Sequence, residues 1–184
     1  CLVGSEMCIR DSNYLPQPND LKRLSQMDAI VVNGIGHDDF ALKVIAAAQR
    51  DDLVVIEANK EVPLLPALGQ SVGQGAVNPH TFVGLSTTIQ KVYTIASEVS
   101  KLDPDNAAFY RKNARKYAKQ FRFMKRDAML SLGELDTSGM KVATTHNAYG
   151  YILQEFGVDV AAVIEPAHGV CLLYTSDAAD DTCC

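Results

Sequence analysis

DNAAFYRKNARKYAKQFRFMKRDAMLSL, residues 105–132, is the stretch that decides the fold. Its apolar side chains recur every three or four positions, which predicts one long amphipathic helix. Asp105 or Asn106 can cap its start, and Gly133 stands where a C-terminal cap belongs. At 1.5 Å per residue this helix spans roughly 40 Å, which suggests a linking helix between two lobes. The predicted stripe consists of Tyr110, Ala114, Tyr117, Phe121, Met124, Ala128 and Leu132.

The residues before this helix predict a βαβ unit. AIVV (29–32) and LVVI (53–56) are short apolar runs typical of buried strands, and an amphipathic helical pattern, 38–48, lies between them. Strand, helix and strand within about 30 residues favour parallel pairing. An irregular segment, 57–79, then leads to a further helix that ends at Asp103-Pro104.

A second βαβ unit follows the long helix. MKVATT (140–145) and VDVAAVI (158–164) predict two strands, with a helix, 148–156, between them. The predicted fold class is therefore α/β, a two-lobed protein with a parallel sheet per lobe joined by one long helix and truncated at both ends. The predicted divisions are an N-terminal lobe, 13–104, the linking helix, 105–132, and the start of a C-terminal lobe, 133–169.

The two ends of the chain read as adapter sequence. The codons ATGTGTATAAGAGACAG encode Met7 to Asp11 and begin Ser12, and their reverse complement encodes Cys171 to Thr175. Because unrelated termini have no reason to be reverse complements, we interpret 1–12 and 170–184 as artefacts of a sequencing library.

Leaving these flanks out changes what the composition implies. All five cysteines lie in the flanks, so they predict nothing about disulfides. The remaining residues hold 16 basic and 17 acidic side chains, a net charge of −1 instead of −5. This balance predicts no nucleic-acid partner and no electrostatic footprint for an acidic membrane surface. No apolar run is long enough to predict a transmembrane helix.

Four histidines and one glutamate are candidate site residues because they lie in turns. His37, His146, Glu165 and His168 follow predicted strands, where ligands bind in open α/β sheets. His80 follows Asn78-Pro79 before a helix. A neutral imidazole in such a place can coordinate a metal, although loop histidines also serve as ordinary hydrogen-bonding groups. Glu165 can instead satisfy backbone groups at its strand end.

Four segments together resemble the metal-binding solute-binding proteins of bacterial ABC transporters, the zinc- and manganese-capturing family. They are YLPQPNDLKRLSQMDAIVVNGIG (14–36), VNPHTFVGLS (77–86), DPDNAAFYRKNARKYAKQF (103–121) and THNAYGYILQEFGV (145–158). The resemblance implies that His80 and His146 are metal ligands. His37 and His168 do not match ligand positions of the family, and together with Glu165 they are weaker candidates because they follow predicted strands.

The resemblance also predicts the cargo and the missing ligands. Imidazole at His146 favours Zn(II) as the transported metal, whereas a carboxylate there would favour Mn(II). The family's first ligand aligns with Ser12, and its fourth would lie beyond Gly169. This chain departs from the family at Asn78, where an aspartate is usual, and at 84–86, where members commonly have a Trp-Leu-Asp-Pro segment. It also lacks the histidine-rich loop of many zinc importers.

The implied function is that of the extracytoplasmic substrate-binding component of an ABC importer. Its parent would be a periplasmic or extracellular protein with a possible lipid anchor, monomeric when intact, that passes metal to a membrane permease. No enzymatic activity is implied, because four protein ligands would close a tetrahedral site. One alternative is a metal-dependent α/β hydrolase that uses His80 and His146 with Glu165 as base. Another is a receptor for a different cargo, with structural histidines.

Overall fold

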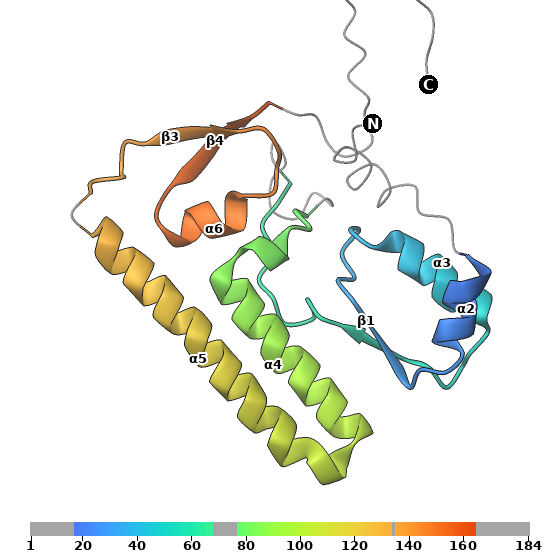
Figure 1. Cartoon of the computed structure of the whole chain (residues 1–184). Coiled ribbons are helices and arrows are strands. Elements are labelled where there is room, and N and C mark those ends of the chain that lie inside the picture. The colour runs from blue at the N-terminus through green and yellow to red at the C-terminus, as the bar shows by residue number, and fades with distance from the viewer. Residues whose placement is uncertain (1–16, 68–76, 134, 165–184) are drawn as a thin grey trace, which may run out of the picture.

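The computed structural model describes residues 17–67, 77–133 and 135–164 (Figure 1). The elements, in chain order, are α2 (Pro18–Leu24), β1 (Ala29–Val32), α3 (Asp39–Ala48), β2 (Val54–Glu57), η1 (Thr81–Val83), α4 (Leu85–Leu102), η2 (Pro104–Asn106), α5 (Ala107–Leu132), β3 (Lys141–Thr144), α6 (Gly150–Glu155) and β4 (Asp159–Val163). In this part of the chain, every helix is too short or too polar to cross a membrane.

The first βαβ unit forms as the sequence predicts. Strands β1 and β2 pair in parallel, with Ala29 opposite Val54 and regular register to Val32 opposite Glu57. Helices α2 and α3 pack over them around a small core of Leu24, Val44 and Leu53. The apolar runs therefore encode a sheet whose carboxyl ends carry the loop from Asn33 to Asp38.

The second unit has the same topology with a less regular sheet. Strands β3 and β4 pair in parallel, and the register shifts between Val142 and Ala143. Helix α6 ends before Gly157, whose φ of 72° lies in the left-handed region that glycine adopts without steric cost. The turn from β3 into α6 contains His146, so the strand end places that side chain as the sequence predicts.

Helices α4 and α5 form an antiparallel hairpin, which Pro104–Asn106 closes as a short 3₁₀ turn. The long helix therefore begins at Ala107, two residues after its predicted start. Neither Asp105 nor Asn106 caps it with a side-chain hydrogen bond. The Asn106 amide donates instead to the Asp103 carboxylate at 2.9 Å, and the Tyr110 hydroxyl donates to the same oxygen at 2.6 Å.

The stripe of α5 that faces α4 differs from the predicted one. Tyr117 and Met124 belong to the predicted stripe, yet their exposed fractions are 51% and 57%. Ala114 of the predicted stripe is buried, and Ala107 and Ala118, which lie outside the predicted stripe, are buried beside it, with Ala118 fully inaccessible. Small side chains allow the two helix axes to approach closely, so bulkier aromatic residues stay at the sides of the contact.

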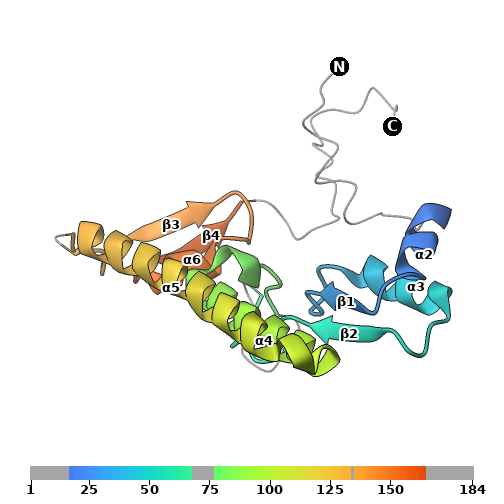
Figure 2. The ribbon, with the colours of Figure 1, turned by 60° about the horizontal axis from the view of Figure 1, so that its bottom comes forward.

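Helix α4 contacts both halves of the molecule. It packs against α5 along the hairpin, against β2 and against α6. Both ribbon views place the first βαβ unit and the second βαβ unit at opposite sides of α4, with α5 on the outside (Figures 1 and 2). The predicted α/β fold class with one parallel strand pair in each part is confirmed.

Candidate metal centre

His80 lies on a buried segment that fixes its ring. The exposed fractions of Asn78 and His80 are 2% and 4%. The Asn78 Oδ1 accepts the His80 backbone N–H at 3.0 Å and lies 2.8 Å from His80 Nδ1. Because an amide oxygen only accepts, Nδ1 carries the proton in this contact, which leaves the lone pair of a neutral ring on Nε2. The contacts with Asn78 thus fix the orientation of the His80 ring.

Asn78 also connects this segment to the turn after β3. Its Nδ2 donates to the Asn147 carbonyl at 3.0 Å and lies 3.3 Å from Asn147 Oδ1. The Tyr151 hydroxyl donates to the Asn78 carbonyl at 2.8 Å and accepts the Leu65 N–H at 3.0 Å. An aspartate at position 78 could accept from His80, but its ionised carboxylate could not donate to Asn147. The departure from the family pattern therefore has a structural role here.

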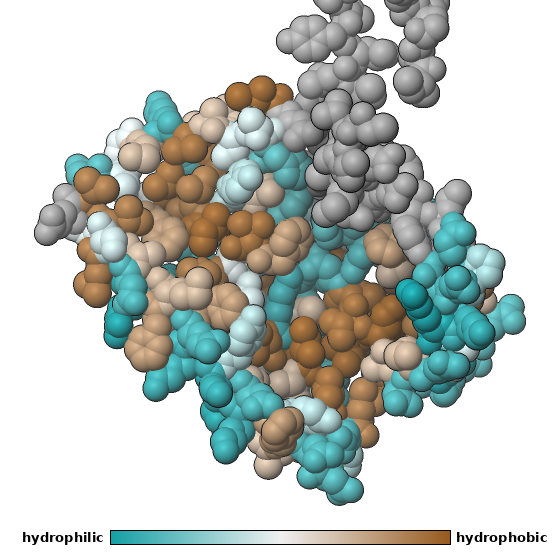
Figure 3. All heavy atoms as spheres, in the orientation of Figure 1, coloured by the Kyte–Doolittle hydropathy of each residue, from teal (hydrophilic) through white to brown (hydrophobic). Residues whose placement is uncertain are grey.

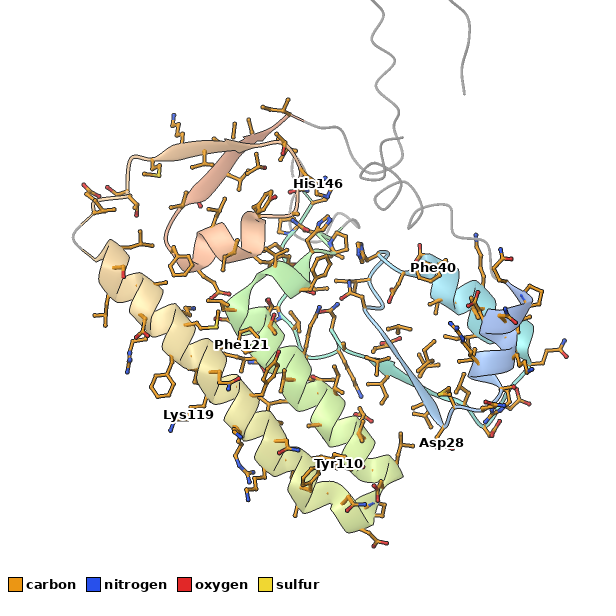
Figure 4. The ribbon with its side chains drawn as sticks, viewed as in Figure 1. Asp28, Phe40, Tyr110, Lys119, Phe121 and His146 are labelled. Atoms are coloured by element: carbon orange, nitrogen blue, oxygen red, sulfur yellow. The ribbon has the colours of Figure 1, made fainter. Side chains whose placement is uncertain are left out.

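His146 approaches His80 from the other side of the site. Its backbone carbonyl accepts the Thr144 hydroxyl at 3.0 Å, and its ring meets the His80 ring edge-on at a centroid distance of 4.8 Å. The two Nε2 atoms are 3.1 Å apart, although the residues are separated by 66 positions. Figure 4 shows His146 at the loops where the two βαβ units meet.

The spacing of the two nitrogens fits a shared metal ion. With metal–nitrogen bonds of about 2.0–2.1 Å, nitrogens 3.1 Å apart would subtend an angle of roughly 95–100° at the metal. This angle lies between octahedral and tetrahedral values, so small ring rotations would serve either geometry. Two of the predicted ligands are thus brought together as the sequence indicated.

His37 also lies beside this pair. Its ring centroid is 5.7 Å from that of His80 and 5.1 Å from that of Phe82. Across the described ranges, no group of three or more His, Cys, Asp or Glu side chains is arranged to hold a metal ion. Glu165 and His168 lie outside the described residues. The ligand roles of all five candidates therefore remain predictions.

A buried lysine is the feature that sequence reasoning missed. Lys91 has an exposed fraction of 9%, and its Nζ donates to Asn33 Oδ1 at 2.9 Å and lies 5.5 Å from the Phe82 ring centroid. Burial lowers the pKa of Lys91 to about 8, against a smaller raising effect of Asp38. Thr87, Lys91 and Thr94 are spaced by four and three residues on α4, which was the available signal for a polar buried face.

Asn33 connects Lys91 to the segment that contains His80 through hydrogen bonds. Its Nδ2 donates to the Pro79 carbonyl at 3.0 Å, and its own carbonyl and Oδ1 both accept from Asn59 Nδ2. The Asn59 Oδ1 in turn accepts the Thr81 hydroxyl at 2.7 Å. This network is defined as Asn33, Asn59, Thr81 and Lys91, and it fixes the backbone on both sides of His80.

Parallel strand pairs on either side of a helical hairpin, with two imidazoles close together at their loops, agree with the fold of metal-binding solute-binding proteins of ABC transporters. The family model described as "ZnuA: Zinc-uptake complex component A periplasmic" matches residues 2–170. The chain belongs to this family.

Named relatives cover most of the chain. The manganese-binding lipoprotein MntA of Halalkalibacterium halodurans is 24% identical over 152 residues, which are 83% of this chain and 49% of MntA. The metal ABC transporter substrate-binding lipoprotein SsaB of Streptococcus sanguinis is 27% identical over 159 residues, with 83% and 50% covered. The chain spans about half the length of the curated relatives it matches.

Solved structures agree on the fold. The solute-binding protein FpvC of Pseudomonas aeruginosa in complex with Mn²⁺ is 50% identical, with a TM-score of 0.78 over 85% of this chain and 58% of FpvC. FpvC with Ni²⁺ is 48% identical, with a TM-score of 0.76 over 85% and 55%. A zinc-bound ZnuA deletion mutant, 23% identical with a TM-score of 0.70 over 84% and 59%, shares the fold.

Proposed function

We propose that this chain is part of the extracytoplasmic substrate-binding component of an ABC importer for a divalent transition metal. The observation that carries the proposal is the 3.1 Å approach of the His80 and His146 Nε2 atoms from opposite sides of the site. The contact of His80 Nδ1 with Asn78 supports it, because metal-bound histidines commonly have their second ring nitrogen fixed by a hydrogen bond.

Zn(II) is the proposed cargo, with Mn(II) second. Imidazole ligands suit zinc, nickel and copper, whereas manganese favours carboxylate and water oxygens. Relatives named for manganese and the Mn²⁺ and Ni²⁺ complexes of FpvC keep the choice among metals open to test. A competition titration with Zn(II), Mn(II) and Ni(II) would rank their affinities directly.

The proposed partner is the membrane permease of the importer. The intact binding protein would meet it in the periplasm or at the cell surface. MntA and SsaB are named as lipoproteins, which agrees with a lipid-anchored parent. The metal is cargo in this proposal, and His80 and His146 bind it without catalysing a reaction. Hydrolysis of an ester or phosphoester by the metal-loaded protein would contradict this part of the proposal.

Metal titration of single-histidine variants tests the proposal. We expect His80→Ala and His146→Ala each to weaken Zn(II) binding by at least about 100-fold, since each removes one of few protein ligands. Isothermal titration with Zn(II), Mn(II) and Ni(II) measures this, and circular dichroism checks that the variants fold.

His37→Ala tests the weaker candidate beside this pair, because the His37 ring centroid lies 5.7 Å from that of His80. We expect it to change zinc affinity less than threefold. A loss as large as that of His80→Ala would add His37 to the ligand set. Zinc affinity unchanged in both His80→Ala and His146→Ala would overturn the proposed site.

A further inference from the structure

The outer face of α5 carries a regular stripe of cations and apolar side chains. Its members recur every three or four residues, so they share one side of the helix. All are exposed, whereas Ala107, Ala114 and Ala118 on the opposite side are buried against α4. We define the α5 outer stripe as Phe109, Lys112, Lys116, Lys119, Phe123, Arg126 and Leu130.

The stripe stands clear of the rest of the described protein. Helix α5 packs extensively only against α4 and the preceding 3₁₀ turn among the described elements. In Figure 4 Lys119 points away from α4, whereas Phe121 points towards it. Figure 3 shows hydrophilic and apolar side chains alternating along the edge of the molecule that α5 forms. At 1.5 Å per residue, Phe109 to Leu130 spans about 32 Å.

The charges of α5 are not balanced locally. Residues 107–132 contain eight lysines and arginines and a single acid, Asp127. Arg126 pairs with Asp127 at 2.7 Å, and Lys125 on the inner side pairs with Glu155 at 3.0 Å. The described residues give Lys112 and Lys116 no ion pair. The chain without its flanks is nearly neutral in net charge, yet helix α5 by itself is strongly cationic.

The aromatic residues of the stripe sit among its cations. Lys119 Nζ lies 5.3 Å from the centroid of the Phe123 ring, and the Arg126 guanidinium lies 4.8 Å from it. Phe109 and Leu130 have exposed fractions of 60% and 71%, which leaves apolar surface near both ends of the stripe. Together with Phe123, they place exposed apolar side chains along the whole length of the cationic stripe.

We propose that the α5 outer stripe docks on an anionic phospholipid bilayer, with the helix lying flat on the surface. Lysine and arginine contact the phosphate groups, and the phenylalanine and leucine side chains enter the acyl boundary. A nucleic acid would pair with the cations but would bury Leu130 poorly, whereas a bilayer offers anionic phosphates and acyl chains side by side. The inference is independent of the metal site, since no stripe residue belongs to it.

Vesicle co-sedimentation of the full chain tests this surface. We expect binding to phosphatidylcholine vesicles with 30% phosphatidylglycerol to exceed binding to pure phosphatidylcholine at least about tenfold at 0.1 M salt. Raising the salt to 0.5 M should remove most of this difference. Lys112→Glu with Lys116→Glu and Lys119→Glu should abolish the preference, and Phe123→Gln should weaken it several-fold.

A second triple variant distinguishes the contribution of the stripe to vesicle binding from that of net charge. Lys22→Glu with Lys43→Glu and Lys60→Glu makes the same charge change on exposed sites of the first βαβ unit and should retain binding within twofold. Equal loss in both triple variants, or no preference of the wild type for anionic vesicles, would overturn the proposal. Binding to DNA or polyglutamate at least as tight as to the vesicles would overturn the lipid assignment. Circular dichroism verifies that every variant folds.

Discussion

His80 and His146 come within 3.1 Å of each other, yet the segments that carry them differ in construction. His80 is buried. Asn33 Nδ2 donates to the Pro79 carbonyl and Asn59 Oδ1 accepts the Thr81 hydroxyl, so both neighbours of His80 are held. The Tyr151 hydroxyl donates to the Asn78 carbonyl. His146 is half-buried on the turn after β3. One candidate ligand, His80, is therefore held by a hydrogen-bond network, whereas the other, His146, is carried by a turn.

Among variants of the residues around His80, Asn78→Ala is expected to have the largest effect, because Asn78 orients the His80 ring. It removes the acceptor of His80 Nδ1 and the donor to Asn147 together, so His80 loses its fixed orientation. We expect zinc affinity to fall about 10–100-fold, the usual effect of losing such a partner. Isothermal titration measures this loss, with Asn147→Ala as the control that leaves the Asn78–His80 contact intact. Asn147→Ala also keeps the backbone carbonyl that accepts from Asn78 Nδ2, so equal losses in both variants would contradict the role of His80 ring orientation.

Substituting Lys91 tests whether the network beside His80 makes the free energy of unfolding depend on pH. The pKa of Lys91 is lowered to about 8, chiefly by burial, from its ordinary 10.5. Between these values the unfolded chain keeps the proton and the folded chain releases it, so the free energy of unfolding rises with pH. We expect a gain of about 1–3 kcal/mol from pH 8 to 10.5 that Lys91→Met lacks. Denaturant unfolding across this range measures it, and an identical pH profile in the variant would refute it.

Tyr151→Phe removes a single hydroxyl from the His80 side and is expected to have the smallest effect. The hydroxyl donates to the Asn78 carbonyl and accepts from the Leu65 backbone, so its loss leaves two buried partners unsatisfied. We expect about 1–2 kcal/mol of destabilisation and an affinity change smaller than that of Asn78→Ala. Thermal unfolding reports the first, and metal titration the second. Tyr149→Phe, on an exposed tyrosine two residues earlier, is the matched control.

Local pattern predicted the parallel strand pairs and the positions of His80 and His146, because strand ends and turns follow from nearby residues. It did not predict the partners of Lys91, since Asn33 lies 58 residues away and only tertiary packing brings them together. It misplaced Tyr117 and Met124 because helical periodicity gives an apolar side but not the closeness of the neighbouring helix. The bridging role of Asn78 likewise depends on Asn147, 69 residues away.

The contacts of α4 with both β2 and α6 have a kinetic consequence. Because one continuous helix supports both sides of the site, separating the two βαβ units would require its packing to break. Releasing a bound ion through movement of the 145–149 turn alone would be faster, since loops rearrange in nanoseconds to microseconds and collective motions take microseconds to milliseconds. If the proposed function holds, this one short turn would be the faster route by which an ion leaves His80 and His146.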